Sequence, residues 1–278
     1  HFVEAGYVDE VYEPELAARI GLLPGGFTVI IHTGSRGFGY QICEDNLRAM
    51  QRASDKYGIF LPDRQLCCAP FRSEEGRRYL AAMKCGANFA FANRQIITHW
   101  VRETIETEWS MSPREHGVSV VYDVCHNIAK VETHVIDGVS RKVCVHRKGA
   151  TRAFPAGHPE VPEAYRDVGQ PVLVPGDMGR YSYVLVGNPE SPGFTFASSC
   201  HGAGRRLSRK AATKATRDRN IIKELAARGI TVGAASRSTV DEEFPEAYKD
   251  VAEVVDVVHR AKLAIKVARL RPVGVIKG

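Results

Sequence analysis

The stretch GGFTVIIHTGSRGFG, residues 25–39, sets the character of this chain. Its part 26–32 is β-branched in the centre and follows a Gly-Gly turn, which predicts a strand. The glycine-rich part 33–39 predicts a loop. A strand that ends in His32 beside such a loop can project a side chain into a cleft, where backbone amides approach an anion. A capped strand end with a solvated Arg36 is an equally good interpretation of the same residues.

The segments around this stretch alternate between helical and extended patterns. Helices are predicted at 13–21, 40–56, 73–107, 205–228 and 251–266, the long one opened by a Ser-x-Glu-Glu start signal at Ser73. Short strands are predicted at 117–124, 130–136, 141–146, 171–174 and 182–187. A structured loop is expected at 149–170, and a final apolar stretch spans 268–276.

This order of segments shows no repeat and no disordered linker. It predicts an α+β fold, a single domain with mixed and antiparallel strands around a central cleft and with peripheral helices.

Composition excludes several classes of protein. Hydrophobic residues make up 44% and charged residues 25% of the 278 positions, as in globular proteins. No apolar run approaches the roughly 18 residues of a membrane span. The seven cysteines are odd in number and lack zinc-ribbon spacing, which argues against a secreted disulfide scaffold. We therefore expect a reducing, cytoplasmic compartment and no membrane partner.

Positive charge is concentrated in one segment. The formal net charge is +6, and residues 201–219 hold a single acid, Asp218, among the cations Arg205, Arg206, Arg209, Lys210, Lys214, Arg217 and Arg219. Such a segment suits a polyanionic partner without identifying one.

His201 lies in Cys-His-Gly-Ala-Gly-Arg-Arg, at the start of this basic segment. Neutral imidazole is nucleophilic, and the neighbouring arginines would stabilise charge that develops on a phosphorus centre. Cys200 is the alternative nucleophile, although a lone cysteine in such a loop more often packs. The sequence favours His201 as the catalytic residue.

Three further segments are open to two interpretations. His126, which follows a predicted strand, suits a divalent metal ion as well as a structural hydrogen bond. The basic run 146–152 (HRKGATR) is most simply a solvated face. The turn Pro175-Gly176-Asp177-Met178-Gly179 could bring its backbone to a ligand, as many hairpin turns could.

Taken together, these motifs resemble the RtcB family of RNA ligases, from His1 to Gly278. The stretches that carry the resemblance are HFVE, HTGSRGFG, ANFAFANRQ, YDVCHNIAKVE, HRKGATR, GQPVLVPGDMG, SCHGAGRRLSR, EAYKDV and VGVIKG. Each is weak alone, but their order and spacing make coincidence a poor explanation.

The resemblance implies a GTP- and manganese-dependent ligase that joins an RNA 3′-phosphate or 2′,3′-cyclic phosphate to a 5′-hydroxyl. His201 would attack the α-phosphorus of GTP and carry GMP, which passes to the RNA 3′-phosphate before the 5′-hydroxyl displaces it. The implied substrates are tRNA halves, and an archease-type activator is an implied partner.

The resemblance also implies roles for individual residues. His1, His32 and His126 match metal ligands of a site for two manganese ions. Contacts to the guanylate fall on Phe2, Glu4, His126, Asn127, Pro175, Gly176, Asp177, Met178, Ser182, His201, Gly202, Ala203, Gly204, Tyr248 and Lys277. RNA or triphosphate contacts are expected at Arg36, Lys148 and Arg205.

This chain departs from the family pattern at several positions. The family's Asp-x-x-Cys pair, which completes the metal site, and the Gly-Asn before the first histidine are not in it. We therefore expect a C-terminal portion of an RtcB-like domain that needs a missing N-terminal portion and is inactive alone; the alternative is a non-catalytic RNA- or nucleotide-binding remnant. Asp177 replaces a small hydroxyl residue, with Arg180 available to neutralise it, and Tyr40 replaces a histidine.

Overall fold

The computed structural model describes residues 1–278. The chain forms two compact units, one made of His1–His32 with Val120–Gly278 and the other of Thr33–Ser119. The first unit carries all the strands and the second is helical.

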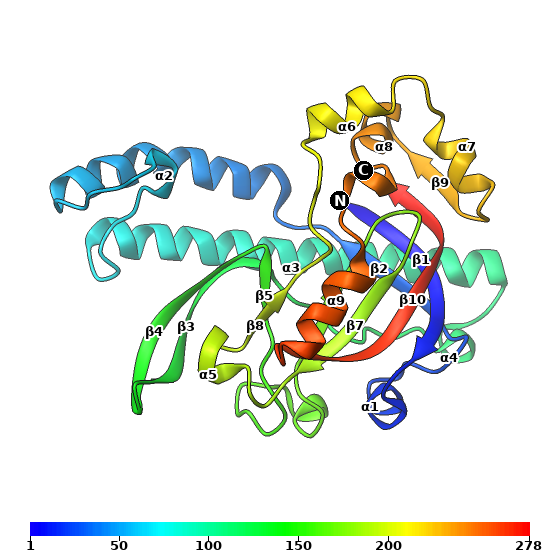
Figure 1. Ribbon diagram of the computed structural model, residues 1–278, viewed down its shortest axis with the longest axis horizontal. Helices are drawn as coiled ribbons and strands as arrows, with labels where there is room; N and C mark the ends of the chain where they lie inside the picture. Colours follow the sequence, from blue (N-terminus) through cyan, green and yellow to red (C-terminus); the bar gives the residue numbers. More distant parts are fainter. The chain divides into compact units, whose positions relative to one another are not determined.

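A six-stranded sheet organises the first unit (Figure 1). Its path is β2-β1-β10-β7-β6, and neighbours along that path are antiparallel. The strands are β1 (Phe2–Val11), β2 (Phe27–His32), β6 (Pro171–Val174), β7 (Ser182–Gly187) and β10 (Ala264–Lys277). Strand β9 (Thr231–Ala234) pairs with the end of β10 in parallel.

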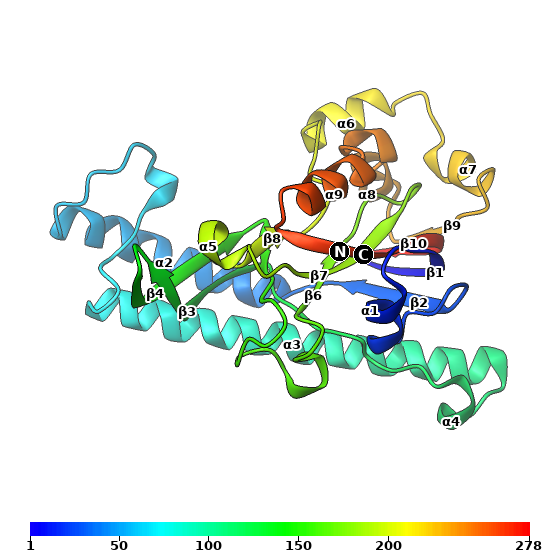
Figure 2. The ribbon, with the colours of Figure 1, turned by 60° about the horizontal axis from the view of Figure 1, so that its bottom comes forward.

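Both faces of β7 are covered, which explains why all six of its residues are buried. Val184 and Val186 point into a cluster that includes Ala17 of α1 (Pro14–Arg19). Tyr183 and Leu185 point the other way, against α9 (Val251–Arg260), and Figure 2 shows α9 above the sheet. Each fully buried aliphatic side chain contributes about 1.5–3 kcal/mol, so these two layers hold the sheet.

Two short antiparallel pairs extend the unit. Strands β3 (Asn127–Ile136) and β4 (Val139–Lys148) form a hairpin. Its turn residues Asp137 and Gly138 both have positive φ, as a tight hairpin turn requires. Strand β5 (Ala150–Arg152) pairs with β8 (Ser198–Cys200). The short helices between these strands are η2 (Glu163–Tyr165) and α5 (Pro192–Thr195).

Short helices surround the parallel end of the sheet (Figure 1). They are α6 (Arg209–Ala215), α7 (Ile221–Ala226), α8 (Arg237–Glu242) and η3 (Pro245–Ala247). Leu225, Val240 and Phe244 are buried together with Val275 of β10. This cluster fixes the last residues of β10 against the loops that follow β8.

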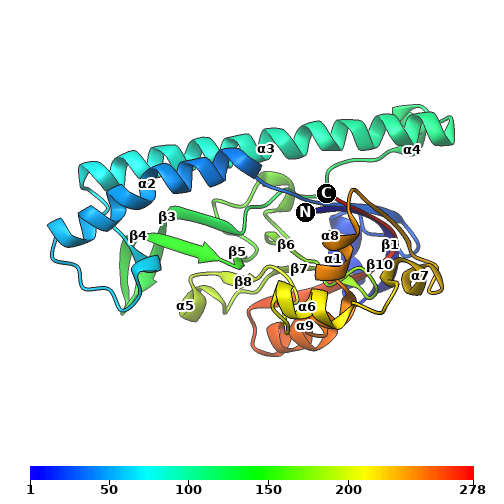
Figure 3. The same ribbon diagram turned by 90° about the horizontal axis from the view of Figure 1, so that it is seen from above.

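The second unit is a helical hairpin. Helices α2 (Arg36–Lys56) and α3 (Glu74–Trp109) run side by side, as Figure 3 shows, with η1 (Arg64–Leu66) between them and α4 (Pro113–His116) after them. A Cβ built on Gly86 would lie 3.3 Å from Ile42 Cδ1, so the small residue permits close packing. Ser73 caps α3 by accepting a hydrogen bond from the Gly76 N–H at 3.0 Å.

The α+β class and its mixed and antiparallel strands are confirmed. The strands predicted at 171–174 and 182–187 have those bounds, and those at 130–136 and 141–146 lie inside the β3–β4 hairpin. None of the helices combines the length and apolarity that crossing a bilayer requires.

Four predicted elements need correction. Residues 117–124 do not form a strand, because Val121 packs against the α1 cluster and its carbonyl accepts the Tyr165 hydroxyl instead of a ladder partner. The helix predicted at 205–228 is two helices, and Asn220 caps the second. The helix from 251 ends at Arg260, since Lys262 has φ 57° and turns the chain into β10. The loop predicted at 33–39 already enters α2 at Arg36.

Candidate active site

Strand register places one end of the site. Phe2 of β1 is the Cα partner of His32 on β2 and of Lys277 on β10. The Phe2 and His32 rings are 5.2 Å apart. The Lys277 ammonium lies 5.0 Å from the centre of the Phe2 ring, a cation–π contact. Residues from the two ends of the sequence and from position 32 therefore meet in one row.

His126 continues that row. It directly precedes β3, and its Nε2 lies 3.0 Å from His32 Nε2, with the two rings nearly perpendicular. Burial lowers the pKa of His32 to about 3, so its ring is neutral at pH 7. Two nitrogens bound to one divalent ion at about 2.1 Å each lie roughly 3 Å apart, so this pair fits a metal ion.

His201 completes the row from the other side. Its ring centre is 4.3 Å from that of His126, and the Ala150–Cys200 pairing of β5 with β8 brings Gly149 beside it. Burial lowers the pKa of His201 against an opposing effect of the Gly149 backbone, which keeps the ring neutral. A neutral imidazole keeps a lone pair on one of its two ring nitrogens.

The backbone conformation of residue 149 favours glycine. Its φ is +68°, in the left-handed region, whereas a Cβ there would make only ordinary contact with the His201 ring, at 3.7 Å. The Gly149 N–H donates to Asn127 Oδ1 at 3.1 Å. Asn127, which was predicted to contact the nucleotide, thus also orders the peptide beside His201.

Cys200 is the weaker candidate nucleophile. Burial raises the pKa of its thiol, whereas a reactive cysteine needs the thiolate. Burial has the opposite consequence for His201, because the neutral imidazole is the nucleophilic form.

Backbone hydrogen bonds to two different segments hold the 202–204 loop in place. The Ala203 N–H donates to the Pro175 carbonyl at 3.2 Å, and the Gly204 carbonyl accepts from the Lys249 N–H at 2.9 Å. In the facing turn, a Cβ on Gly176 would come within 2.1 Å of the Tyr181 carbonyl oxygen, so only glycine fits. The structure therefore joins the predicted 175–178 turn to the predicted glycine loop.

Two buried acids belong to this part of the site, Glu4 on β1 and Asp177 in the 175–178 turn. Glu4 is 5% exposed and accepts a hydrogen bond from Ser182 Oγ at 2.9 Å; burial raises its pKa to about 7. Burial also raises the pKa of Asp177, to about 6. Arg180 Nε lies 3.0 Å from Asp177 Oδ2, so Arg180 does pair with Asp177 as expected. Met178 is buried beside them, against Leu225.

Lys277 and Arg205 both contact Glu243, a residue to which the sequence gave no role. The Lys277 ammonium pairs with Glu243 Oε2, and Arg205 Nη1 lies 3.8 Å from Glu243 Oε1. Arg205 also donates to the Tyr248 hydroxyl at 3.1 Å and lies over the Tyr248 ring. Arg205 therefore has a framework role, and its RNA or triphosphate contact stays a prediction.

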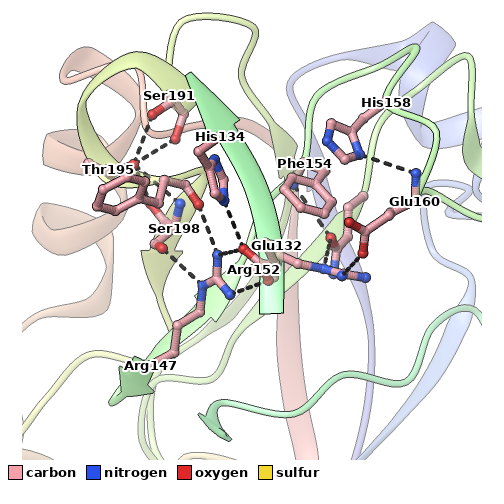
Figure 4. A network of polar contacts seen from close by, with 12 residues as sticks. Glu132, His134, Arg147, Arg152, Phe154, His158, Glu160, Ser191, Thr195 and Ser198 are labelled. Carbon is pink, nitrogen blue, oxygen red and sulfur yellow. Dashed lines mark hydrogen bonds and ion pairs between the residues drawn. The ribbon is translucent and has the colours of Figure 1, made fainter. Parts of the chain in front are cut away.

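The basic run 146–152 is not one solvated face, which corrects that interpretation. Arg147 is 3% exposed and makes two hydrogen bonds to Glu132, at 2.7 and 2.9 Å. It also donates to Ser198 Oγ (Figure 4) and to the Phe196 carbonyl. Lys148, its neighbour, is exposed and pairs in register with Asn127.

The remaining predicted residues lie as follows. The backbone N–H of Gly278 donates to the His1 carbonyl, with 3.5 Å between the nitrogen and the oxygen. Arg36 is the first residue of α2 in the second unit, with φ 49°, and Tyr40 is exposed on the same helix. No group of three or more His, Cys, Asp or Glu side chains has an arrangement that could hold a metal ion. Within the site, His32 and His126 are the two side chains whose ring nitrogens have a spacing that suits a shared metal ion.

Comparison with known proteins gives a consistent result. The sequence profile of the family described as tRNA-splicing ligase RtcB matches residues 1–278. The tRNA-splicing ligase RtcB of Thermococcus kodakarensis is 59% identical over 100% of this chain and 58% of its own length. The corresponding protein of Pyrococcus abyssi is 57% identical over 100% of this chain and 30% of its own length. That of Methanococcus maripaludis is 51% identical, with 100% and 58% covered.

Proposed function

This chain belongs to the RtcB family, and we propose that it carries the nucleotidyl-transfer site of an RNA ligase active in tRNA splicing. The ligase joins an RNA 3′-phosphate or 2′,3′-cyclic phosphate to a 5′-hydroxyl end and consumes GTP. The chain spans 58% of the Thermococcus kodakarensis relative, so the activity of the whole protein is part of the proposal. The observation that carries it is the row of side chains from Lys277 through His32 and His126 to His201.

His201 is the nucleophile of the proposed reaction. Its free ring nitrogen attacks the α-phosphorus of GTP, so a P–N bond forms and the bond to pyrophosphate breaks. An oxygen of the RNA 3′-phosphate then displaces His201 and takes the guanylate. Finally the 5′-hydroxyl attacks the RNA phosphorus, loses its proton and releases GMP. A cyclic phosphate is first opened by water to a 3′-phosphate.

The surrounding residues bind and orient the nucleotide. Glu4, as a carboxylate, accepts hydrogen bonds from the guanine edge, and Lys277 holds the nucleotide beside Phe2. The loop 202–204 and the turn 175–178 supply small residues and backbone groups, which let a phosphate approach closely. The fixed loop spares the reaction the entropy of ordering it.

His32 and His126 are the residues that would hold a manganese ion, with His1 as the third histidine of the proposed set. Bound there, the metal would neutralise and orient phosphate oxygens. The spacing of the two Nε2 atoms and the neutrality of the His32 ring support this assignment. A site for two ions, as the family resemblance implies, would need ligands in addition to this pair.

RNA is the proposed polyanionic partner. The segment that follows His201 exposes four cations, Arg206, Lys210, Lys214 and Arg217. Lys148, the last residue of β4, is also exposed. Contacts to phosphates from such side chains would weaken as salt rises. tRNA halves as substrates, an archease-type activator and a cytoplasmic location belong to the same proposal.

Labelled GTP tests the proposal directly. The chain, and a chimera in which it replaces the matched part of the Thermococcus kodakarensis relative, are incubated with α-labelled GTP and Mn²⁺. We expect acid-labile, covalent label on the chimera, lost in His201→Ala and kept in Cys200→Ala. Ligation of an RNA with 2′,3′-cyclic phosphate and 5′-hydroxyl ends should follow the same pattern.

Two outcomes would contradict it. Label that persists in His201→Ala would remove His201 as nucleophile. Salt-sensitive RNA binding without any covalent GMP in the chimera would favour a non-catalytic binding protein.

A further inference from the structure

We propose that Glu243 is a positioning residue of the nucleotide site, whose carboxylate holds Lys277, Arg205 and Tyr248 in register with one another. The inference rests on the proposed function, because it concerns how that site binds GTP. Glu243 itself matched no motif and received no role from the sequence.

Lys277 depends on this carboxylate. It is 5% exposed, and an ammonium taken out of water needs an opposite charge. The Lys277 ammonium pairs with Glu243 Oε2, and it also lies 5.0 Å from the centre of the Phe2 ring. A lysine on a four-carbon stem has many rotamers, and this pairing selects one of them.

The same carboxylate reaches the other side of the site. Its Oε1 lies 3.8 Å from Arg205 Nη1, and against the effect of burial Lys277 and the Tyr248 hydroxyl help to lower its pKa. Arg205 in turn donates to the Tyr248 oxygen at 3.1 Å and to the Leu207 carbonyl at 2.9 Å. Glu243 therefore links the end of β10, the segment after His201, and the residue that follows η3.

The location of Glu243 makes it a fixed point. It ends helix α8, as the residue after Glu242, and the neighbouring Phe244 is buried in the cluster that holds Val275. The backbone around it is thus tied to the sheet, and its side chain is 20% exposed. Since Glu243 contacts the proposed nucleotide-binding residues rather than the reacting groups, its effect should appear in GTP affinity.

The neighbouring residue provides a matched control. Glu242 is also acidic, but its side chain is 38% exposed and lies 3.6 Å from Arg209. Its contact with Arg205 uses the backbone carbonyl, which a side-chain substitution keeps. Glu242→Gln therefore removes one negative charge from the same place without touching the Lys277 pair.

The experiment compares Glu243→Gln, Glu243→Asp and Glu242→Gln in the chain and in the chimera. The dissociation constant of GTP is measured by calorimetry, and the rate and amplitude of His201 guanylylation by quench flow. Loss of hydrogen bonds to charged groups predicts GTP binding about ten- to a hundredfold weaker in Glu243→Gln. Glu243→Asp should lose less, and Glu242→Gln should stay within about twofold.

The outcomes separate this inference from the proposed function. Unchanged GTP affinity in Glu243→Gln overturns the inference, and so does a fall only in guanylylation amplitude, which would mark a folding defect. Weaker GTP binding in Glu243→Gln without guanylylation of the wild type would keep the inference and reject the ligase. A wild type that binds no GTP would overturn both.

Discussion

Two acids in different parts of the first unit, Glu132 and Glu243, make the same kind of contact. Each lies between an arginine and a second basic side chain. Glu132 lies in the β3–β4 hairpin between Arg147 and His134, with its side chain 0% exposed. Glu243 lies at the end of α8 between Arg205 and Lys277, with its side chain 20% exposed. Both acids have a pKa held low by their cationic neighbours, against the effect of burial.

The two clusters differ in how completely their donors are used. Arg147 uses four of its five N–H donors on Glu132, Ser198 and Phe196, and it is 3% exposed, so little of the guanidinium remains for a ligand. Figure 4 shows Arg147 beside Glu132 and Ser198. Lys277 has three donors, and its hydrogen bond to Glu243 Oε2 uses one of them. The comparison teaches that a buried ion pair is structural when its hydrogen bonds close on themselves, and available for binding when they do not.

Removing Arg147 should have the largest effect. Arg147→Met leaves the Glu132 carboxylate buried with an incomplete set of partners, and breaking such a pair costs about 3–5 kcal/mol. We expect that loss in the free energy of unfolding, measured by urea denaturation. Arg141→Met, an exposed arginine on the same strand, is the control and should change stability by less than about 0.5 kcal/mol.

A second substitution sharpens the test. Adding Glu132→Gln to Arg147→Met removes the uncompensated charge and should restore part of the lost stability. If Arg147→Met lowers the free energy of unfolding no more than Arg141→Met does, the Glu132 cluster of the hairpin does not have the structural role assigned to it.

Asp177 gives the next largest effect. Its pKa of about 6 lies above the roughly 3.9 of an unfolded aspartate. Between these values the native state keeps the proton that the unfolded state has lost, so stability falls as pH rises and the penalty is complete above about pH 6. Asp177→Asn should therefore raise the unfolding free energy by about 1–3 kcal/mol at pH 8 and by little at pH 4. An equal effect at both pH values would refute the assignment to this carboxyl.

Glu4 should show a smaller effect, in binding rather than in stability. Its pKa is about 7, so it gains a proton as pH falls through 7 and would no longer accept both of the hydrogen bonds that we propose it receives from guanine. GTP should bind more weakly below pH 7, by at most about tenfold per pH unit. Glu4→Gln should give weak binding that is flat in this range, as followed by calorimetry. A pH profile that Glu4→Gln leaves intact would point to a different group, and exposed Glu10→Gln is the control.

The exposed cations should matter least individually. Lys214 is exposed on α6 and belongs to neither cluster. Lys214→Gln should lower the slope of log affinity for RNA against log salt by about 0.7–0.9, with little change in stability. Lys262→Gln, which lies outside the basic segment and pairs with Glu190, should leave the slope unchanged. Equal slopes in the two variants would place the RNA path elsewhere.

Sequence patterns predicted the parts of this fold that depend on local order. The bounds of β6 and β7 follow from short β-branched runs between turns, and Ser73 marks the start of α3. The 117–124 run has the same β-branched texture, but no strand lies beside it to complete a ladder. Strand β1 was missed, since its partner β10 is at the far end of the sequence.

The sequence pointed to the histidines and glycines of the candidate site and to the acids Glu4 and Asp177, but not to Glu243. His32, His126 and His201 lie in glycine- and polar-rich loops that suggested a site, and the structure brings their rings together. Glu243 and Glu132 gave no such signal, because an ion pair depends on which distant cation the fold places opposite. For the same reason Arg147 was interpreted as solvated although it is buried.

The pairing of Phe2 with Lys277 also has a consequence for how the protein is made. These partners are 275 positions apart, and contacts so distant in sequence form slowly because a long loop must close first. At about 5–20 residues per second, β1 leaves the ribosome on the order of 14 to 55 s before β10 can join it. During that interval one edge of β1 has no partner. A chaperone that shields such an edge would act before the nucleotide site exists.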